Sequence, residues 1–282
     1  MAIFSNSKSS IAALAMLLMA STPGLPAQKS EVSNNDLPDV VDSNNLFAMD
    51  LYQKISAQNT GKNIFVSPFS ISTALAMTFE GSSNNTRKQM AIVLHLDLPD
   101  ADRRAGYSAL LAATSVRPGK HYKLDVANAL WGQKGYDFEA PFLNATGKFY
   151  GGALKSVDFA GNTEGARVEI NTWVEDHTAK MIRDLIPKGA IDPQTPLVLT
   201  NAIYFKGQWA SQFKPAATKD APFNVSDSVK VQVPMMWQTG HYRYVHENGV
   251  AAIELPYADD DLSMIVILPD GDIEKTALRR NL

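Results

Sequence analysis

The stretch PLVLTNAIYFKGQW, residues 196 to 209, most restricts what this chain can fold into. Side chains of a β-strand alternate between the two faces of a sheet, so these residues divide into two sets. One face carries Leu197, Leu199, Asn201, Ile203 and Phe205, and the opposite face carries Val198, Thr200, Ala202 and Tyr204. Because both sets are largely apolar, both faces must be covered, as in the middle of a large sheet.

Helical and strand patterns surround this strand. Residues 122 to 133, YKLDVANALWGQ, alternate as a second strand, and Asn128 interrupts its apolar face as Asn201 does in the first. From Thr163 an amphipathic helix carries an apolar stripe that extends to Met181 and needs a surface to lie on. An antiparallel meander is predicted for the last third, from the segments VPMM, HYRYVHENG, VAAIELPYADDD and LSMIVILPDG.

The segment NIFVSPFSISTALAMTFEG begins at Asn63 and is rich in hydroxyl groups. Residues 63 to 66 predict a short strand, and Ser67 followed by Pro68 predicts the N-cap and first residue of a helix. An α/β-type serine hydrolase needs a G-x-S-x-G elbow, which is absent, and Pro68 lacks the N–H that would donate to an oxyanion. We therefore expect Ser70 and Asn201 to form a polar cluster where a sheet rests on a buried helix. A secreted serine hydrolase that uses Ser67 or Ser70 is the alternative.

Composition argues against several classes of function. The net charge is −3, and the sequence has no Lys/Arg run of the kind that neutralises a phosphate backbone, so we expect no nucleic-acid partner. The chain has no cysteine, and its five histidines form no H-E-x-x-H motif, so we expect no metal site. Nucleotide-binding glycine motifs are absent, and no cofactor is expected. His177 lies on the apolar stripe of its helix and is interpreted as a core histidine.

The N-terminus has the order of a secretory signal peptide. Lys8 precedes the apolar run IAALAMLLMA, and small residues follow at Gly24 and Ala27, either of which would suit cleavage. We expect residues 1 to 27 to be the signal peptide, residues 28 to 40 a polar linker, and residues 41 to 282 the folded domain. Spanning a bilayer takes about 20 apolar residues, a length that no stretch reaches, so we expect no membrane span.

These stretches together resemble the serpin family. The resemblance runs from about Val41 to the C-terminus, in the order and at the spacings of that family. The most specific match is the combination of S-P-x-S-I, N-x-W-V-x-x-x-T and NAIYFKGQW. The other matching stretches are NIFVSPFSISTALAMTFEGSSNNTRKQM, LDVANALWGQKGYDFEAPF, INTWVEDHT, VPMM and VAAIELPYADDDLSMIVILPD.

The resemblance implies an α+β fold of three β-sheets with eight or nine helices. It also implies an inhibitor rather than an enzyme: the target serine or cysteine protease cleaves an exposed reactive loop and is trapped while that loop inserts into the largest sheet. Ser67, Ser70 and Asn201 match the family's "shutter" and Trp209 matches its "breach". The helix from Thr163 would lie across the sheet and yield during insertion. A monomer, secreted to the extracellular space or to a bacterial periplasm, is expected.

Two departures from the family pattern stand out. The helix from Thr163 usually ends T-x-G-K-I, whereas this chain has Lys180 in place of the glycine. The chain ends at Leu282, where the family continues with further strands, the hinge and the reactive loop. We therefore expect a longer coding sequence that supplies them. A non-inhibitory serpin-fold carrier or chaperone is the alternative function, and the alanine-rich hinge of inhibitors, which this sequence does not contain, would discriminate the two.

Overall fold

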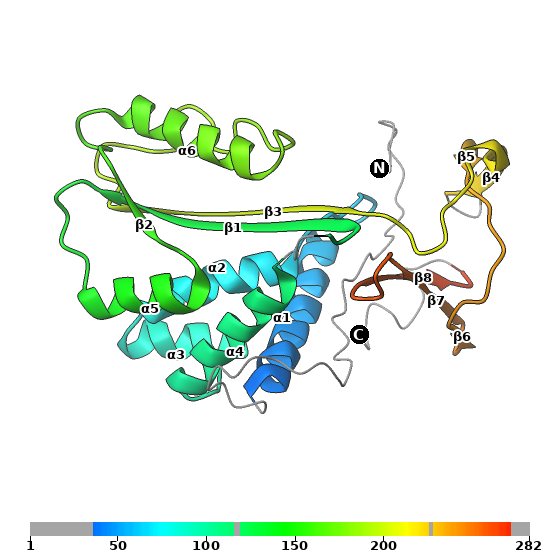
Figure 1. The fold of residues 1–282 in the computed structure, drawn as a ribbon, viewed down its shortest axis with the longest axis horizontal. Helices are drawn as coiled ribbons and strands as arrows, with labels where there is room; N and C mark the ends of the chain where they lie inside the picture. The colour runs from blue at the N-terminus through cyan, green and yellow to red at the C-terminus, as the bar shows by residue number, and fades with distance from the viewer. Residues whose placement is uncertain (1–35, 116–118, 226–227, 272–282) are drawn as a thin grey trace.

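The computed structural model describes residues 36–115, 119–225 and 228–271. These residues form six α-helices and three separate β-sheets, which confirms the α+β class (Figure 1). The predicted signal peptide and residues 28 to 35 lie outside the described residues. No helix in the described ranges combines the length and the apolar character that crossing a membrane requires.

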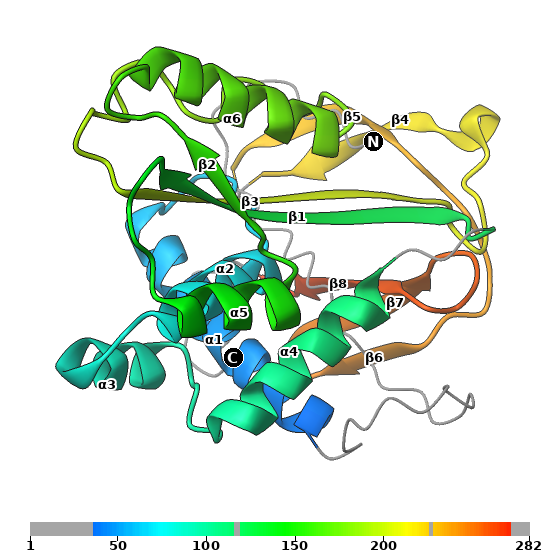
Figure 2. The ribbon, with the colours of Figure 1, turned by 60° about the vertical axis from the view of Figure 1, so that its left-hand side comes forward.

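The central sheet has the order β2-β1-β3. Strands β1 (Tyr122–Gln133) and β3 (Leu197–Gly207) pair antiparallel, with Asn128 opposite Asn201. The short strand β2 (Leu154–Val157) runs parallel to β1 on its other side. In both ribbon views α6 lies on one face of this sheet, and α2 and α5 lie on the other (Figures 1 and 2). The prediction that both faces of the strand at 197 to 207 are covered is therefore confirmed.

The helical layer beneath the sheet comes from the first half of the chain. It consists of α1 (Asp36–Gln58), α2 (Pro68–Glu80), α3 (Asn84–Val93), α4 (Asp100–Thr114) and α5 (Ala140–Tyr150). Its largest core joins fully buried Met77 and Tyr107 of these helices to Leu130 of β1. Leu199 and Ile203 of β3 pack against the same core, so α2 presents its buried face to both long strands.

On the opposite face, α6 (Thr163–His177) covers the sheet with Ile170 and Val174, both 0% exposed. The predicted stripe is wrong at its C-terminal end. His177 is exposed and stacks on Trp173, with ring centroids 4.1 Å apart, and Met181 is 72% exposed. The helix ends at His177, and in the turn that follows Thr178 is 1% exposed and Ile182 packs against the core that contains Val174.

The last third forms two sheets rather than one meander. Strands β6 (Tyr244–Glu247), β7 (Val250–Pro256) and β8 (Ser263–Pro269) make the predicted antiparallel meander. Strand β5 (Lys230–Met235), which contains the first three residues of VPMM, instead pairs with β4 (Lys219–Asn224) in a separate two-stranded sheet. A short 3-10 helix (Pro215–Ala217) precedes β4.

Two predicted boundaries differ from the structure. Helix α1 begins at Asp36, inside the predicted linker, and Val40 is only 1% exposed because it packs in the core of the helical layer. Residues 63 to 66 form no strand, since the structure gives them no ladder with any described strand, and Phe65 is fully exposed.

The turn after α6 shows what the departure from T-x-G-K-I does to the backbone. Ala179 and Lys180 both have positive φ, at 50° and 61°, in the left-handed region that favours glycine. The turn is nevertheless hydrogen-bonded, because the Lys180 N–H donates to the Glu175 carbonyl at 2.7 Å and the Thr178 hydroxyl donates to the Val174 carbonyl at 2.8 Å. Strain in this turn therefore comes from residue type and not from missing hydrogen bonds.

Lys180→Gly should stabilise the chain by about 1 kcal/mol, because glycine occupies the left-handed region without the Cβ penalty. The measurement is the midpoint of thermal unfolding followed by circular dichroism. Lys180→Ala removes the same charge but keeps the Cβ, so it should leave the midpoint nearly unchanged. Equal effects of the two substitutions would show that charge, and not backbone strain, governs this turn.

Candidate functional site

Helix α2 starts with a cap that orients its first turn toward the sheet. Ser67 is the N-cap, and its Oγ accepts a hydrogen bond from the Ser70 backbone N–H at 3.4 Å, while Pro68 occupies the first helical position. This cap was predicted from the sequence and is confirmed. Its consequence is that the Ser70 side chain, one turn into the helix, faces the underside of β1 and β3.

Three side chains from α2, β1 and β3 form a hydrogen-bonded chain in which Ser70 and Asn128 are buried and Asn201 is half-buried. The Ser70 hydroxyl donates to the Asn201 Oδ1, and the Asn201 Nδ2 donates to the Asn128 Oδ1 at 2.5 Å. Ser70 is 4% exposed and Asn128 is 9% exposed. An unpaired polar group at such depth costs about 1 to 3 kcal/mol, so each amide and hydroxyl depends on its neighbour. We call Ser70, Asn128 and Asn201 the polar cluster.

The structure brings Ser70 and Asn201 together as the sequence predicted, and it places Ser67 one step away as a helix cap. Asn128 belongs to the same contact, although sequence reasoning did not include it among the site residues. The signal was present, because Asn128 and Asn201 each interrupt an apolar strand face, and only the register shows that they lie opposite each other.

The polar cluster lacks the parts of a nucleophilic site. The Ser70 hydroxyl points to an amide oxygen and not to a base, and Ser67 serves as a cap. The neighbouring hydroxyls also contact carbonyl or amide oxygens and no base. Thr73 donates to the Phe69 carbonyl at 2.8 Å, and the Ser72 hydroxyl lies 2.5 Å from the Asn44 amide oxygen of α1 and 3.1 Å from the Phe69 carbonyl. The geometry therefore suits a structural contact between helix and sheet, and it gives the hydrolase alternative no support.

Trp209 lies beyond the C-terminal end of β3, away from the polar cluster. Its ring stacks on Tyr257, with centroids 4.4 Å apart and planes 11° apart, and the two residues form an isolated β-bridge. Tyr257 is 5% exposed, and burial raises the pKa of its hydroxyl. A side chain at Gly207 would place a Cβ 2.6 Å from the Tyr257 ring, so this approach requires glycine. The contact fastens the end of β3 to the β7–β8 turn.

A buried charged network at the other end of α2 was not predicted. The Glu80 carboxylate, 0% exposed, accepts hydrogen bonds from Arg103 at 2.8 Å, from Arg104 at 2.7 Å and from the Tyr150 hydroxyl at 2.8 Å. Burial would raise the pKa of Glu80, but the hydrogen bonds from Arg104 and Arg103 outweigh it and hold the pKa below its ordinary value. The pKa of the Tyr150 hydroxyl is raised, first by burial and then by the negative charge of Glu80 beside it. The network joins α2 to α4 and α5.

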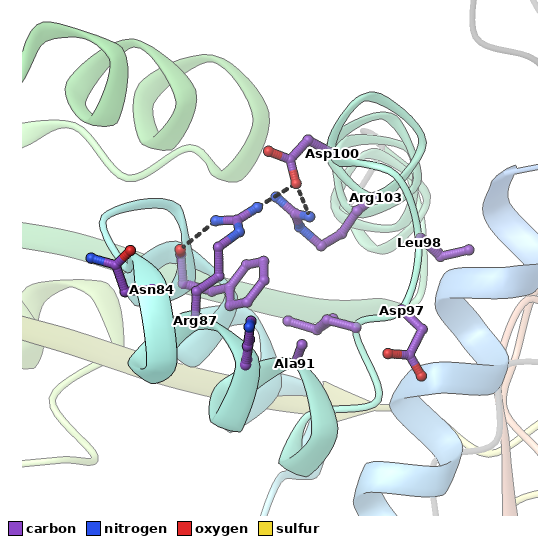
Figure 3. A pocket seen from close by; sticks show the side chains of 10 residues that line it. Asn84, Arg87, Ala91, Asp97, Leu98, Asp100 and Arg103 are labelled. Atoms are coloured by element: carbon purple, nitrogen blue, oxygen red, sulfur yellow. Dashed lines mark hydrogen bonds and ion pairs between the residues drawn. The ribbon is translucent and has the colours of Figure 1, made fainter.

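A pocket between α3 and α4 adjoins this network. Figure 3 shows Arg87 of α3 and Arg103 of α4 converging on Asp100, with Ala91 and Leu98 on the pocket wall. The guanidinium groups of Arg87 and Arg103 also lie over the Phe79 ring, 4.1 and 4.6 Å from its centroid. Both of these cations are thus already paired with Asp100.

Ser70→Ala should destabilise the chain by about 1 to 3 kcal/mol, because it leaves the half-buried Asn201 oxygen without its donor. Urea unfolding followed by tryptophan fluorescence measures the change. Ser115→Ala is the matched control, since Ser115 is exposed and its hydroxyl only bonds to the Leu111 carbonyl of its own helix. A Ser70→Ala effect no larger than that of the control would contradict the polar cluster as a stabilising contact.

Acid should weaken the fold through Glu80. A carboxyl group whose folded-state pKa is lowered adds stability above its ordinary pKa of 4.5, and that stability is lost as the pH falls through the lower folded-state value. Glu80→Gln should cost about 3 to 5 kcal/mol at neutral pH, because it leaves buried Arg103 uncompensated. The unfolding free energy of the Glu80→Gln variant should also fall less steeply than that of the unsubstituted chain between about pH 5 and pH 3, the range in which a carboxyl group titrates.

Glu169→Gln is the control for this pH profile, because Glu169 is an exposed carboxylate on the solvent side of α6. It should leave the profile close to that of the unsubstituted chain. Identical pH profiles for the unsubstituted chain and Glu80→Gln would show that Glu80 does not govern acid stability.

Comparison with known proteins confirms the resemblance. The family model described as Serpin (serine protease inhibitor) matches residues 42–281. A serpin-like protein of Thermococcus kodakarensis is 41% identical over 254 residues, which are 89% of this chain and 58% of that protein. The leukocyte elastase inhibitor of Sus scrofa is 43% identical over 241 residues, which are 84% of this chain and 63% of that protein.

Solved structures share the arrangement of helices and sheets. Emu ovalbumin (Dromaius novaehollandiae) superposes with a TM-score of 0.81 at 31% identity, over 86% of this chain and 66% of that chain. Cleaved Serpin 42Da superposes with a TM-score of 0.79 at 36% identity, over 85% and 64% of the two chains. The chain spans about three fifths of the length of the relatives named above. Because the family model covers most of its residues, the chain belongs to the serpin family.

Proposed function

We propose that the whole protein is a secreted serpin that inhibits a serine or cysteine protease as a suicide substrate. The observation that carries this proposal is the 41 to 44% identity to proteins named leukocyte elastase inhibitor, over most of this chain. A protease of the leukocyte elastase type is accordingly the first target to test. In this proposal the protein performs no catalysis of its own, and the protease is its partner.

The geometry of the central sheet supports inhibition by strand insertion. Within the described residues β3 pairs only with β1, so its second edge is open to another strand. Backbone groups along such an edge are strong hydrogen-bonding sites for an extended segment. A reactive loop that inserts after cleavage would gain a full ladder of hydrogen bonds there, and burial between the two layers that already cover β3.

The polar cluster and the Trp209 contact have separate tasks in this proposal. Ser70, Asn128 and Asn201 lie in the middle of the sheet, where the strands must shift to admit a new one, and their hydrogen bonds can be remade in a second arrangement. Trp209 on Tyr257 closes the end of β3, where insertion would begin. These assignments correspond to the shutter and the breach. Ser67 contributes as the cap that positions Ser70.

Secretion is part of the proposal and rests on the signal-like pattern of residues 1 to 27. The protein would act in the extracellular space, or in the periplasm if its source is a bacterium. We expect a monomer, because one inhibitor molecule traps one protease in this mechanism.

A denaturing gel of the full-length protein with a protease panel tests the function. Inhibition predicts a complex that survives boiling in detergent, with an apparent mass near the sum of the two proteins, for at least one elastase-type or other serine protease. Protease inactivated at its nucleophile should give no such band. Cleavage of the full-length protein by every protease in the panel, without any stable complex, would contradict inhibition and favour the non-inhibitory carrier or chaperone.

A further inference from the structure

Beneath α6 a tryptophan is bound to both long strands of the sheet. Trp131 of β1 is 1% exposed, and its indole N–H donates to the Thr200 hydroxyl of β3 at 2.8 Å. This hydrogen bond fixes the ring in one orientation on the sheet. A side chain that packs on the Trp131 ring is therefore held in position relative to both β1 and β3.

Helix α6 meets this ring through a second tryptophan. Trp173 packs on Trp131 edge-on, with centroids 5.6 Å apart and planes 81° apart. This T-shaped arrangement is one of the two that aromatic pairs prefer, and it adds directional attraction to the apolar burial. The polar anchors of α6 point elsewhere, since Arg167 and Asn171 bind the Ile186 backbone in the loop before β3.

Lys155 of β2 completes this contact. It lies next to Trp131 in the parallel β1–β2 ladder, and its Nζ is 5.4 Å from the Trp131 ring and 5.6 Å from the Trp173 ring. Both distances lie within the range of a cation–π interaction, and the lysine is half-buried. None of the ion pairs found among the described residues includes Lys155, so the two rings are the partners that the structure gives its ammonium.

An apolar core also joins this side of the sheet to α6. Val157 of β2 and Phe159, which follows it, share that core with Ile170 of α6, and apolar contacts of this kind are non-directional. The ammonium of Lys155 differs, because its attraction depends on staying close to both rings at once. Lifting α6 would remove Trp173 from the Lys155 ammonium and would expose that ammonium to water.

We propose that Lys155 is a positioning residue that holds α6 on the sheet by placing its ammonium beside both Trp131 and Trp173. The strength of this cation–π contact sets how often α6 lifts from the sheet. The inference rests on the proposed function in one respect, namely that strand insertion requires α6 to yield. The contact itself, and the local opening that it restrains, are measurable in the absence of any protease.

Hydrogen exchange of the 282-residue chain tests the proposal. Lys155→Met keeps an unbranched apolar side chain of similar length and removes the cation. The backbone amides of α6 should then exchange about 3- to 10-fold faster, as expected for the loss of a partly desolvated cation–π contact. The amides of α2 and α5 should keep their rates. Lys155→Arg keeps a cation over both rings and should restore α6 exchange to within about 2-fold of the unsubstituted chain.

Lys148→Met is the matched control, because Lys148 lies 5.1 Å from the Phe149 ring on α5, on the opposite side of the sheet. It should leave α6 exchange unchanged. Unchanged α6 exchange in Lys155→Met would overturn the proposal. An equal acceleration in α2, α5 and α6 would also overturn it, since that would show general destabilisation.

The full-length protein separates this inference from the proposed function. If the proposed function holds, Lys155→Met should trap protease faster than the unsubstituted protein. Absence of any trapped complex with either protein contradicts the proposed function and leaves the exchange result to decide the role of Lys155. Faster α6 exchange with unchanged trapping would remove the link to insertion while confirming the positioning contact.

Discussion

The antiparallel pairing of β1 and β3 is the interaction on which the other layers depend. Its register places Asn128 opposite Asn201 and Leu130 opposite Leu199 on the side of α2, and it places Trp131 and Thr200 on the side of α6. Each helical layer packs on a surface that only this register creates. Because strand side chains alternate, a slip by one residue would exchange the two faces and separate every polar group from its partner.

Polar groups inside this sandwich supply specificity that apolar packing alone does not. The apolar cores on both faces would tolerate small shifts, whereas the polar cluster below the sheet and the Trp131–Thr200 bond above it each require one alignment. The same property makes them suitable for a sheet that is proposed to rearrange. A hydrogen-bonded cluster has discrete alternative arrangements, so it can hold the sheet in one of two states.

Local patterns predicted much of the fold, and contacts between distant residues account for the rest. The two apolar faces of β3, the stripe of α6 and the cap at Ser67 follow from alternation, helical period and proline chemistry, each within a short window of sequence. The buried pairing of Glu80 with Arg103 joins residues 23 positions apart on different helices, and no period connects them. His177 was placed wrongly because helical spacing does not show where the supporting surface ends. The strand expected at residues 63 to 66 failed for lack of a partner strand.

The length of chain between the members of the polar cluster has a consequence for synthesis. Ser70 and Asn201 are 131 residues apart. A ribosome that adds about 5 to 20 residues each second needs roughly 7 to 26 s to make the second after the first. During that interval β3 is absent, so the Ser70 hydroxyl lacks the Asn201 oxygen to which it donates in the folded chain. The helices of the first half of the chain are therefore made before β3, the strand that completes their contact with the sheet. A factor that binds nascent apolar helices has this interval in which to act.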